Sequence, residues 1–336
     1  MEEEEFITEK PAPVALPFGR AEIAGLRPPS NGAERARLIA SVGFAAGLTL
    51  AYAKPLMNWA AYAVQSELCS YVLLAPVISA YLIGVQWRRL PREYSTSFIL
   101  AGPLAVTAAA VLGLWWRLGA SAHPLSVNDS LSLILLSFVG LLWAIGFLFL
   151  GRRWMASVAF AAAFLLFMAP LPDAVVDWLE RGSTLASAEA ADRFFSLAGV
   201  PAVRDGVIFQ LPDITIQVAQ ECSGIRSSLV LFITSLVAGR LFLRSRWRQA
   251  ALVACVIPLG IARNGFRILV IGWLCVHLGP DMIHSPIHKR GGPLFFALSI
   301  PFLLFLLWCL MRGERRKHRL GATGGARGPG APIEQN

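Results

Sequence analysis

One cysteine of the chain lies where a thiol could act as a nucleophile. Cys222 belongs to the sequence Glu221-Cys222-Ser223-Gly224-Ile225-Arg226, at the start of an apolar run that predicts a helix. Unpaired N–H groups at a helix N-terminus favour the thiolate, and Arg226, one turn on, adds positive charge. Cys222 is therefore a candidate for covalent catalysis. The alternative is a small buried apolar residue, and this is how we interpret the remaining cysteines: Cys69, Cys255, Cys275 and Cys309.

Two arginines interrupt a later apolar stretch, in Ile261-Ala262-Arg263-Asn264-Gly265-Phe266-Arg267. Charges inside a membrane are costly and are functional candidates. Counting from Gln249, Arg267 is 18 residues along, and an α-helix of that length rises about 27 Å, close to the hydrocarbon thickness. Arg267 is thus expected at the outer boundary, level with Cys222, and Arg263 one turn deeper on the same face. Each arginine could instead snorkel toward lipid headgroups.

A histidine precedes the last apolar run. His288 lies in Ile287-His288-Lys289-Arg290-Gly291-Gly292, with His284 as a rival and a surface-loop histidine as the alternative for both. A thiol, a guanidinium and an imidazole from three segments would meet at one membrane depth. Together they can perform acyl transfer: the thiolate attacks a carbonyl, the guanidinium stabilises the oxyanion, and the imidazole carries the proton.

The histidines and cysteines have no spacing typical of a zinc site. No Gly-x-Ser-x-Gly elbow, His-Glu-x-x-His or phosphate loop is present. We therefore expect neither a metal nor a cofactor.

The composition indicates what must position these residues. The chain is 56% hydrophobic and 15% charged, with a mean hydropathy of +0.59, whereas soluble domains are about 25% charged. Blocks of apolar residues predict an all-α polytopic integral membrane protein with about eight spanning helices. Their expected ranges are about 38–53, 68–87, 97–116, 129–150, 154–170, 223–243, 249–278 and 291–311. Lys54-Pro55 is expected to end the first helix, with a short loop after it.

The distribution of positive charge predicts the topology. With both termini cytoplasmic, the cytoplasmic segments hold 19 Lys and Arg and the outer segments hold 7, as the positive-inside rule requires. Residues 1–37 then form a flexible cytoplasmic tail, 38–311 the membrane domain and 312–336 a basic cytoplasmic tail. The acidic N-terminus lacks the pattern of a signal peptide, so the first apolar block is expected to be a retained anchor. Because the basic residues lie at block ends, the net charge of +9 does not indicate nucleic-acid binding.

The longest outer segment, 171–222, predicts a small extracytoplasmic structure. Residues 173–197 are expected to form one or two helices against the membrane face, broken by Gly199 and Pro201. Alternating residues at 207–210 and 214–218 flank Leu211-Pro212-Asp213, which predicts a β-hairpin. The hairpin would end four residues before Cys222 and so determine where that residue enters the membrane.

These motifs resemble the exosortase/archaeosortase family of membrane cysteine proteases and transpeptidases. The resemblance covers most of 38–311 and rests on three motifs in order: Cys-Ser-Gly at 222–224, Asn-x-x-Arg at 264–267, and His288 followed by Gly292. It implies a catalytic triad of Cys222, Arg267 and His288, which favours Arg267 over Arg263 and His288 over His284. The expected supporting residues are Ser223, Gly224, Arg226, Arg263 and Asn264.

The resemblance also implies a function. Such a protein would cleave C-terminal sorting signals of exported proteins, each with a Pro-Glu-Pro-type motif, a transmembrane helix and a basic tail. It would act at the periplasmic face of the inner membrane, through a thioester on Cys222, in cells that produce exopolysaccharide. The acceptor that resolves the thioester, whether water, an amine or a glycan, is left open.

A second hypothesis is a non-catalytic component of polysaccharide export, in which Arg263 and Arg267 bind an anionic lipid or glycan. Formation of a thioester at Cys222 would distinguish the two. A transporter is ranked lower, because it predicts charges at mid-membrane on several helices, and the first five predicted helices have essentially none at their centres.

Overall fold

The computed structural model describes residues 32–66, 70–91, 93–122, 125–212, 214–218, 224–279, 281–282 and 292–324. Within these ranges the side chains of 70, 226 and 315–324 are outside the description. The chain divides into two compact units. The first contains 1–54, 76–114 and 136–166, and the second contains 55–75, 115–135 and 167–336.

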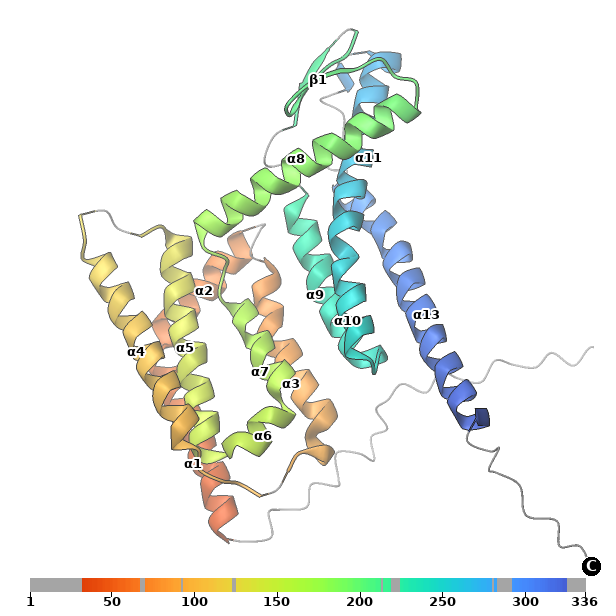
Figure 1. Ribbon diagram of the computed structural model, residues 1–336. Coiled ribbons are helices and arrows are strands. Elements are labelled where there is room, and N and C mark those ends of the chain that lie inside the picture. The colour runs from red at the N-terminus through yellow and green to blue at the C-terminus, as the bar shows by residue number, and fades with distance from the viewer. Residues whose placement is uncertain are drawn as a thin grey trace, which may run out of the picture. The chain divides into compact units, whose positions relative to one another are not determined.

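The described part of the chain is mainly helical (Figure 1). The α-helices are α1 Gly32–Ala51, α2 Ala53–Gln65, α3 Leu74–Gln86, α4 Phe98–Gly119, α5 Val127–Phe149, α6 Gly151–Ser157, α7 Ala159–Phe164, α8 Asp173–Leu197, α9 Ile225–Phe242, α10 Arg246–Ala254, α11 Val256–Leu278 and α13 Gly292–Gly324. Short 3₁₀ turns occupy Ser70–Leu73, Trp87–Arg89 and Leu165–Met168. A small antiparallel sheet is formed by β1 Val203–Asp205, β2 Ile208–Gln210 and β3 Thr215–Gln217, in the order β1-β2-β3.

Several helices are long and apolar enough to cross a membrane. In the described residues there are five: Tyr71–Arg89, Phe98–Gly119, Val127–Phe149, Arg246–Leu278 and Gly292–Glu314. The number rises to seven if the bent pairs α1–α2 and α6–α7 each count as one span, and α9 contains a shorter apolar helix. The helices have the length and composition of a polytopic membrane protein. The eight-span layout itself stays a prediction.

The segment after the first helix differs from the sequence-based expectation. α1 ends at Ala51, but α2 begins at Ala53, so a second helix stands where a loop was expected. Pro55 lies in the first turn of α2. Proline is tolerated there because N–H groups of the first turn have no acceptor within the helix. Lys54-Pro55 therefore opens a helix after the bend.

The first unit is held together by contacts between α1 and α5. The hydroxyls of Tyr52 and Ser137 are 2.9 Å apart and buried. The ring of Tyr52 also packs on Phe138, and Phe44 packs on Phe149. At the start of α6, Gly151 has φ +84°, and a Cβ there would lie 2.3 Å from the main-chain oxygen of Ser95. A glycine is required at this turn because no side chain fits.

In the second unit, the start of α8 is fixed by the first residues of α5. Asn128 donates to the carbonyl of Leu171 at 2.6 Å and to Asp173 Oδ1 at 2.7 Å. The Asp129 carboxylate accepts the main-chain N–H of Asp173 at 2.9 Å. The first turn of a helix leaves its N–H groups without helical acceptors, and this contact pairs one of them. The negative charge of Asp129 is also favourable near a helix N-terminus.

The structure contains the helix and the hairpin predicted for residues 171–222, while their extracytoplasmic location stays a prediction. α8 is a single helix over Asp173–Leu197, and it ends at Gly199, whose φ is +67°. The Val200 N–H bonds to the Phe195 carbonyl at 3.1 Å, completing a Schellman-type cap. β2 pairs with β3 as an antiparallel hairpin. The additional strand β1, which pairs with β2, was not predicted.

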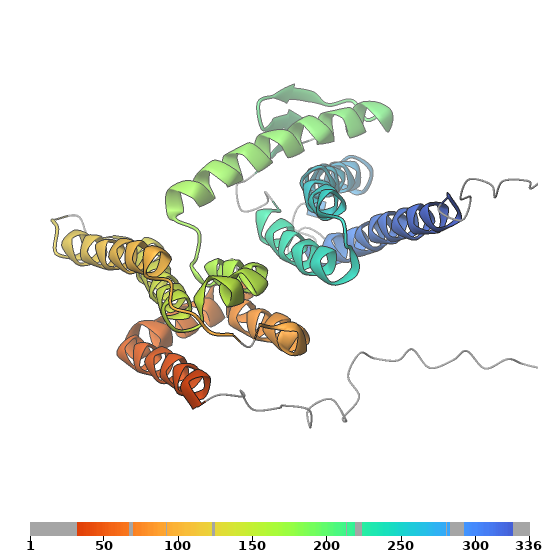
Figure 2. The ribbon, with the colours of Figure 1, turned by 60° about the horizontal axis from the view of Figure 1, so that its bottom comes forward.

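α8 packs along the second half of α11 and passes the start of α9 (Figures 1 and 2). The buried face of α8 consists mainly of small residues: Thr184, Ser187, Ala188 and Ala191, with Phe195 at its end. Two glycines of α11 permit this close approach. A Cβ at Gly265 would lie 2.8 Å from Ala190 Cβ, and a Cβ at Gly272 would lie 2.6 Å from Phe195 Cζ. The core between α8, α11 and the sheet includes Phe209, Ile216, Ile268 and Ile271.

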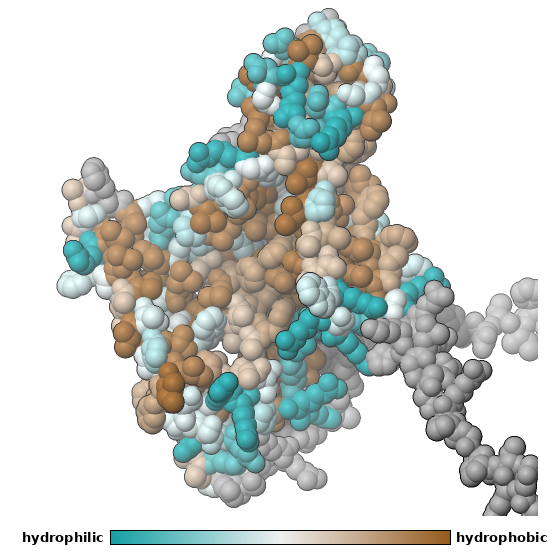
Figure 3. Space-filling model, viewed as in Figure 1, coloured by the Kyte–Doolittle hydropathy of each residue, from teal (hydrophilic) through white to brown (hydrophobic). Residues whose placement is uncertain are grey.

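At the other end of α9 and α11, an acidic side chain joins three helices. The Glu314 carboxylate accepts the main-chain N–H of Ser245 at 2.8 Å and that of Arg244 at 3.2 Å. Arg248 donates to the Leu310 carbonyl of α13 at 3.0 Å. Within the second unit, hydrophilic residues gather at this end and on the sheet, with apolar surface along the helices between (Figure 3). That pattern suits helices that cross a bilayer.

Candidate active site

The guanidinium of Arg263 holds the start of α9. Its Nη2 donates to the Gly224 carbonyl at 3.0 Å and lies 3.3 Å from Ser228 Oγ. The same carbonyl also accepts the Ser227 hydroxyl at 2.9 Å and the Ser228 N–H at 3.0 Å. Arg263 is only 7% exposed. Two motifs that are far apart in the sequence, Cys-Ser-Gly at 222–224 and the arginine segment of α11, therefore meet at Gly224.

Small residues make this approach possible. Gly224 has φ +70°, a conformation that side chains rarely adopt, and a Cβ there would lie 3.0 Å from Arg263 Nη2 and 3.2 Å from Asn264 Oδ1. A Cβ at Gly260, one turn before Asn264, would lie 2.6 Å from Ser228 Oγ. The first turn of α9 thus packs on Gly260, Arg263 and Asn264. We call these three residues the α11 seat.

Arg267 follows Arg263 by four residues and is partly buried. Residues four apart lie on the same face of a helix, so Arg267 is one turn nearer to the sheet. The two positive charges repel one another. Arg263 donates to two neutral groups, the Gly224 carbonyl and Ser228 Oγ. The site therefore places two cations inside an apolar stretch, as the sequence predicted.

Two donors of the seat have no acceptor among the described residues. They are Arg263 Nη1 and Asn264 Nδ2, and both are buried. Leaving a buried donor unpaired costs about 1–3 kcal/mol, so such groups need an explanation.

Several predicted site residues lie outside the described residues. These are Cys222, Ser223, His288 and its rival His284, together with the side chain of Arg226. Of the predicted set, the structure brings together Gly224, Arg263 and Asn264. The roles predicted for Cys222, Arg267 and His288 stay predictions.

The chain that leads to Cys222 is anchored on both sides. The Val218 N–H bonds to the Val207 carbonyl at 3.0 Å, which closes the hairpin. Gly224 is held by Arg263 at 3.0 Å. The hairpin therefore ends at a defined point four residues before Cys222, as expected, and the chain is fixed again two residues after it.

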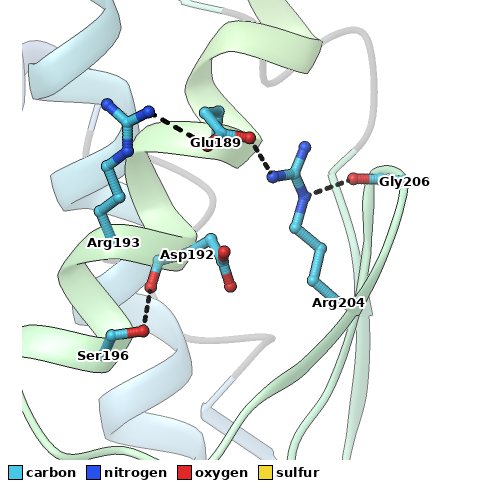
Figure 4. Close-up of polar contacts among 6 residues, drawn as sticks. All are labelled: Glu189, Asp192, Arg193, Ser196, Arg204 and Gly206. Atoms are coloured by element: carbon cyan, nitrogen blue, oxygen red, sulfur yellow. Dashed lines mark hydrogen bonds and ion pairs between the residues drawn. The ribbon is translucent and has the colours of Figure 1, made fainter.

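A polar cluster connects α8 to the sheet (Figure 4). Arg204 of β1 donates to Glu189 Oε2 at 2.5 Å and to the Gly206 carbonyl at 2.8 Å. Arg193 reaches Glu189 Oε1 at 3.2 Å. The hydrogen bond from Arg204 holds the pKa of the Glu189 carboxyl below its ordinary value, and the positive charges of both arginines act in the same direction. Sequence analysis missed this cluster.

The seat was also only partly anticipated. Gly260 and Ser228 were not singled out, since a lone glycine or serine in an apolar run has no local signal beyond its small size. In the described ranges, no three His, Cys, Asp or Glu side chains are grouped so that they could hold a metal ion.

Comparison with known proteins gives one family. The family described as transmembrane exosortase (Exosortase_EpsH) matches residues 59–306. The matched range contains the α11 seat, Gly224 and the positions of Cys222 and His288. No match was found among curated proteins or among solved structures.

Proposed function

The chain belongs to the transmembrane exosortase family, and on this basis we propose that it is a membrane cysteine protease or transpeptidase. Its substrates are exported proteins that carry a C-terminal sorting signal with a recognition motif, a transmembrane helix and a basic tail. The reaction proceeds through a thioester on Cys222. Arg267 and His288 complete the catalytic set.

One observation supports this proposal above the others: the contact between Arg263 and Gly224. It joins the Cys-Ser-Gly motif to the helix that carries Asn-x-x-Arg, and it does so within the range that matches the family. Acyl transfer needs a nucleophilic thiol close to a cation that stabilises the oxyanion. Cys222 is two residues before Gly224, and Arg267 is one helical turn from Arg263.

In the first half of the reaction, the Cys222 thiolate attacks the carbonyl carbon of the scissile peptide bond. Negative charge develops on the carbonyl oxygen, where the Arg267 guanidinium stabilises it. The C–N bond then breaks, His288 gives a proton to the leaving amine, and the acyl group remains on sulfur as a thioester. The buried donors Arg263 Nη1 and Asn264 Nδ2 are available to the main chain of the substrate.

In the second half, an acceptor resolves the thioester. Water, an amine or a glycan hydroxyl attacks the acyl carbon while His288 takes its proton, and the C–S bond breaks to regenerate the thiolate. Hydrolysis and transpeptidation differ only in this acceptor. The proposed groups serve both.

We place the site at the periplasmic face of the inner membrane. The excess of Lys and Arg in the segments assigned to the cytoplasm favours this orientation. The surface of α8 is consistent with contact to a membrane, since Trp178 is 71% exposed and Leu185 is 53% exposed. A sorting signal with its own transmembrane helix would then present its cleavage site at the same depth.

A second candidate is a non-catalytic component of exopolysaccharide export. The charge of Arg263, which donates to the neutral Gly224 carbonyl and Ser228 Oγ, favours this candidate. A cation beside neutral acceptors would also bind a phosphate or an acidic sugar. This candidate needs no thiol. The two functions therefore differ in whether they require Cys222.

The test is covalent trapping. The chain is expressed with a reporter that ends in a sorting signal, and the peptide containing Cys222 is followed by mass spectrometry. We expect a hydroxylamine-sensitive acyl adduct on Cys222, and loss of both adduct and cleavage in Cys222→Ala. Cys255→Ala is the matched control and should cleave normally, since Cys255 is exposed at the α10–α11 junction. Full cleavage by Cys222→Ala would end the cysteine mechanism.

A further inference from the structure

We propose that the α11 seat is a positioning device for the nucleophile, with Arg263 as its central residue. This inference rests on the proposed function, because it concerns how Cys222 is held for reaction. The seat fixes the first turn of α9 before substrate arrives. It thereby fixes Gly224, two residues after Cys222, relative to the helix that carries Arg267.

The first support is the number of contacts on one carbonyl. The oxygen of Gly224 accepts from Arg263 Nη2 at 3.0 Å, from the Ser227 hydroxyl at 2.9 Å and from the Ser228 N–H at 3.0 Å. A charged donor makes a stronger hydrogen bond than a neutral one. Gly224 cannot shift without giving up the bond to a buried cation.

The second support is steric. Gly260 lets Ser228 approach to a distance at which a Cβ would be only 2.6 Å from Oγ, and the face of Gly224 lies against Arg263 and Asn264. The start of α9 thus contacts α11 at two points, through Ser228 and through Gly224. Close packing of this kind opposes sliding of α9 along α11.

The third support is the place of Arg267 on the same helix. Four residues of α-helix separate Arg263 from Arg267, a rise of about 6 Å. Because α11 carries both arginines, the contact at Gly224 fixes the start of α9 relative to the cation that would meet the oxyanion. Displacement by about 1 Å can reduce a reaction rate by about 100-fold, so a shift at this contact has a measurable effect.

The experiment uses the full chain in lipid nanodiscs, with a synthetic sorting-signal peptide as substrate. Gly260→Ala pushes on Ser228 without changing any charge. We expect kcat to fall by about 10-fold or more, with KM within about two-fold. In the same samples, the alkylation rate of Cys222 by iodoacetamide, followed by mass spectrometry, should change by at least about three-fold. Gly102→Ala is the matched control, because a Cβ at Gly102 has nothing within 4 Å.

A size exchange tests the contact itself. In Gly260→Ala/Ser228→Ala the atom nearest to the new methyl is removed, and the next lies at an ordinary 3.5 Å. We expect this double variant to recover most of the kcat lost in Gly260→Ala, which general destabilisation would not allow. If Gly260→Ala does not accumulate in the membrane, Arg263→Lys decides instead. It keeps the charge but loses the planar fork, and should lower kcat by about 10-fold.

The results separate this inference from the proposed function. Wild-type kcat and wild-type alkylation of Cys222 in both Gly260→Ala and Arg263→Lys would overturn the positioning role, even if Cys222→Ala is inactive. If Cys222→Ala still cleaves, while Cys222 alkylation depends on the seat, then the cysteine mechanism fails. The seat would then still hold the Cys222 segment, but without a role in catalysis.

Discussion

Glu189 of α8 and Arg204 of β1 form an ion pair across 15 residues of sequence, and this pair joins the sheet to the helix. Arg204 donates a second hydrogen bond, to the Gly206 carbonyl in the turn between β1 and β2. The outer segment is therefore tied together by charge as well as by its apolar core.

This ion pair predicts a pH dependence. The pKa of Glu189 is lowered from its ordinary 4.5, chiefly by the hydrogen bond from Arg204. A lowered carboxyl pKa adds stability above the unfolded value, and this is lost as pH falls through the folded value. We expect wild type to resist proteolysis of residues 198–218 better than Glu189→Gln at about pH 7, with the difference disappearing well below pH 4.5. Glu93→Gln is the control. An equal difference at every pH would contradict this assignment.

The glycines of α11 give a second prediction. Gly272→Ala places a methyl 2.6 Å from Phe195 Cζ and 2.8 Å from its Cε1, inside the core between α8 and α11. Overpacking of this kind costs about 1–3 kcal/mol. Thermal unfolding in detergent should show the loss for Gly272→Ala, whereas Gly113→Ala, whose Cβ meets nothing within 4 Å, should be neutral or stabilising. Equal stabilities of the two variants would show that α8 is not seated on Gly272.

The third prediction concerns the two arginines. If Arg267 stabilises the oxyanion, its planar fork matters and Lys cannot replace it, so Arg267→Lys should cleave at least about 100-fold more slowly. Arg263→Lys should be milder, since it positions the nucleophile segment through Gly224. The measurement is a time course of cleavage at equal membrane levels of each variant. Near-normal rates for Arg267→Lys would indicate that Arg267 only snorkels toward lipid headgroups. A larger loss in Arg263→Lys than in Arg267→Lys would indicate that Arg263 is the catalytic cation.

The fourth prediction is the topology. Reporter domains fused after Arg153 and after Arg290 should report opposite compartments, with Arg153 inside and Arg290 outside. The expectation follows from the excess of Lys and Arg in the segments assigned to the cytoplasm. A common compartment for both fusions would exclude the eight-span layout.

Local patterns predicted the outer segment well. The limits of α8 and the hairpin of β2 and β3 follow from signals within a few residues, such as Gly199 after the helix and Pro212 in the turn. β1 was missed, because it is three residues long and Arg204 is explained only by its distant partner Glu189. α2 was not predicted, because a proline can either end one helix or stand in the first turn of another. Pro55 lies in the first turn of α2.

The site was predictable in its residue types but only partly in its geometry. Helix rise and membrane thickness predict Arg267 level with Cys222 and Arg263 one turn deeper, and these depths stay predictions. The contact between Arg263 and Gly224 was not predicted. The fit of Gly260 against Ser228 could not be derived in this way. It depends on the exact approach of two helices, which is set by every side chain between them.

The close match of α8 to α11 limits how this protein can be recombined with its relatives. Gly265 and Gly272 accept Ala190 and Phe195 at distances that admit no additional methyl group. A chimaera that takes α8 from one parent and α11 from another would combine surfaces shaped for different partners. Crossover points between 198 and 255 should therefore give poorly folded hybrids, whereas an exchange that moves residues 173–278 as one block should preserve the fit.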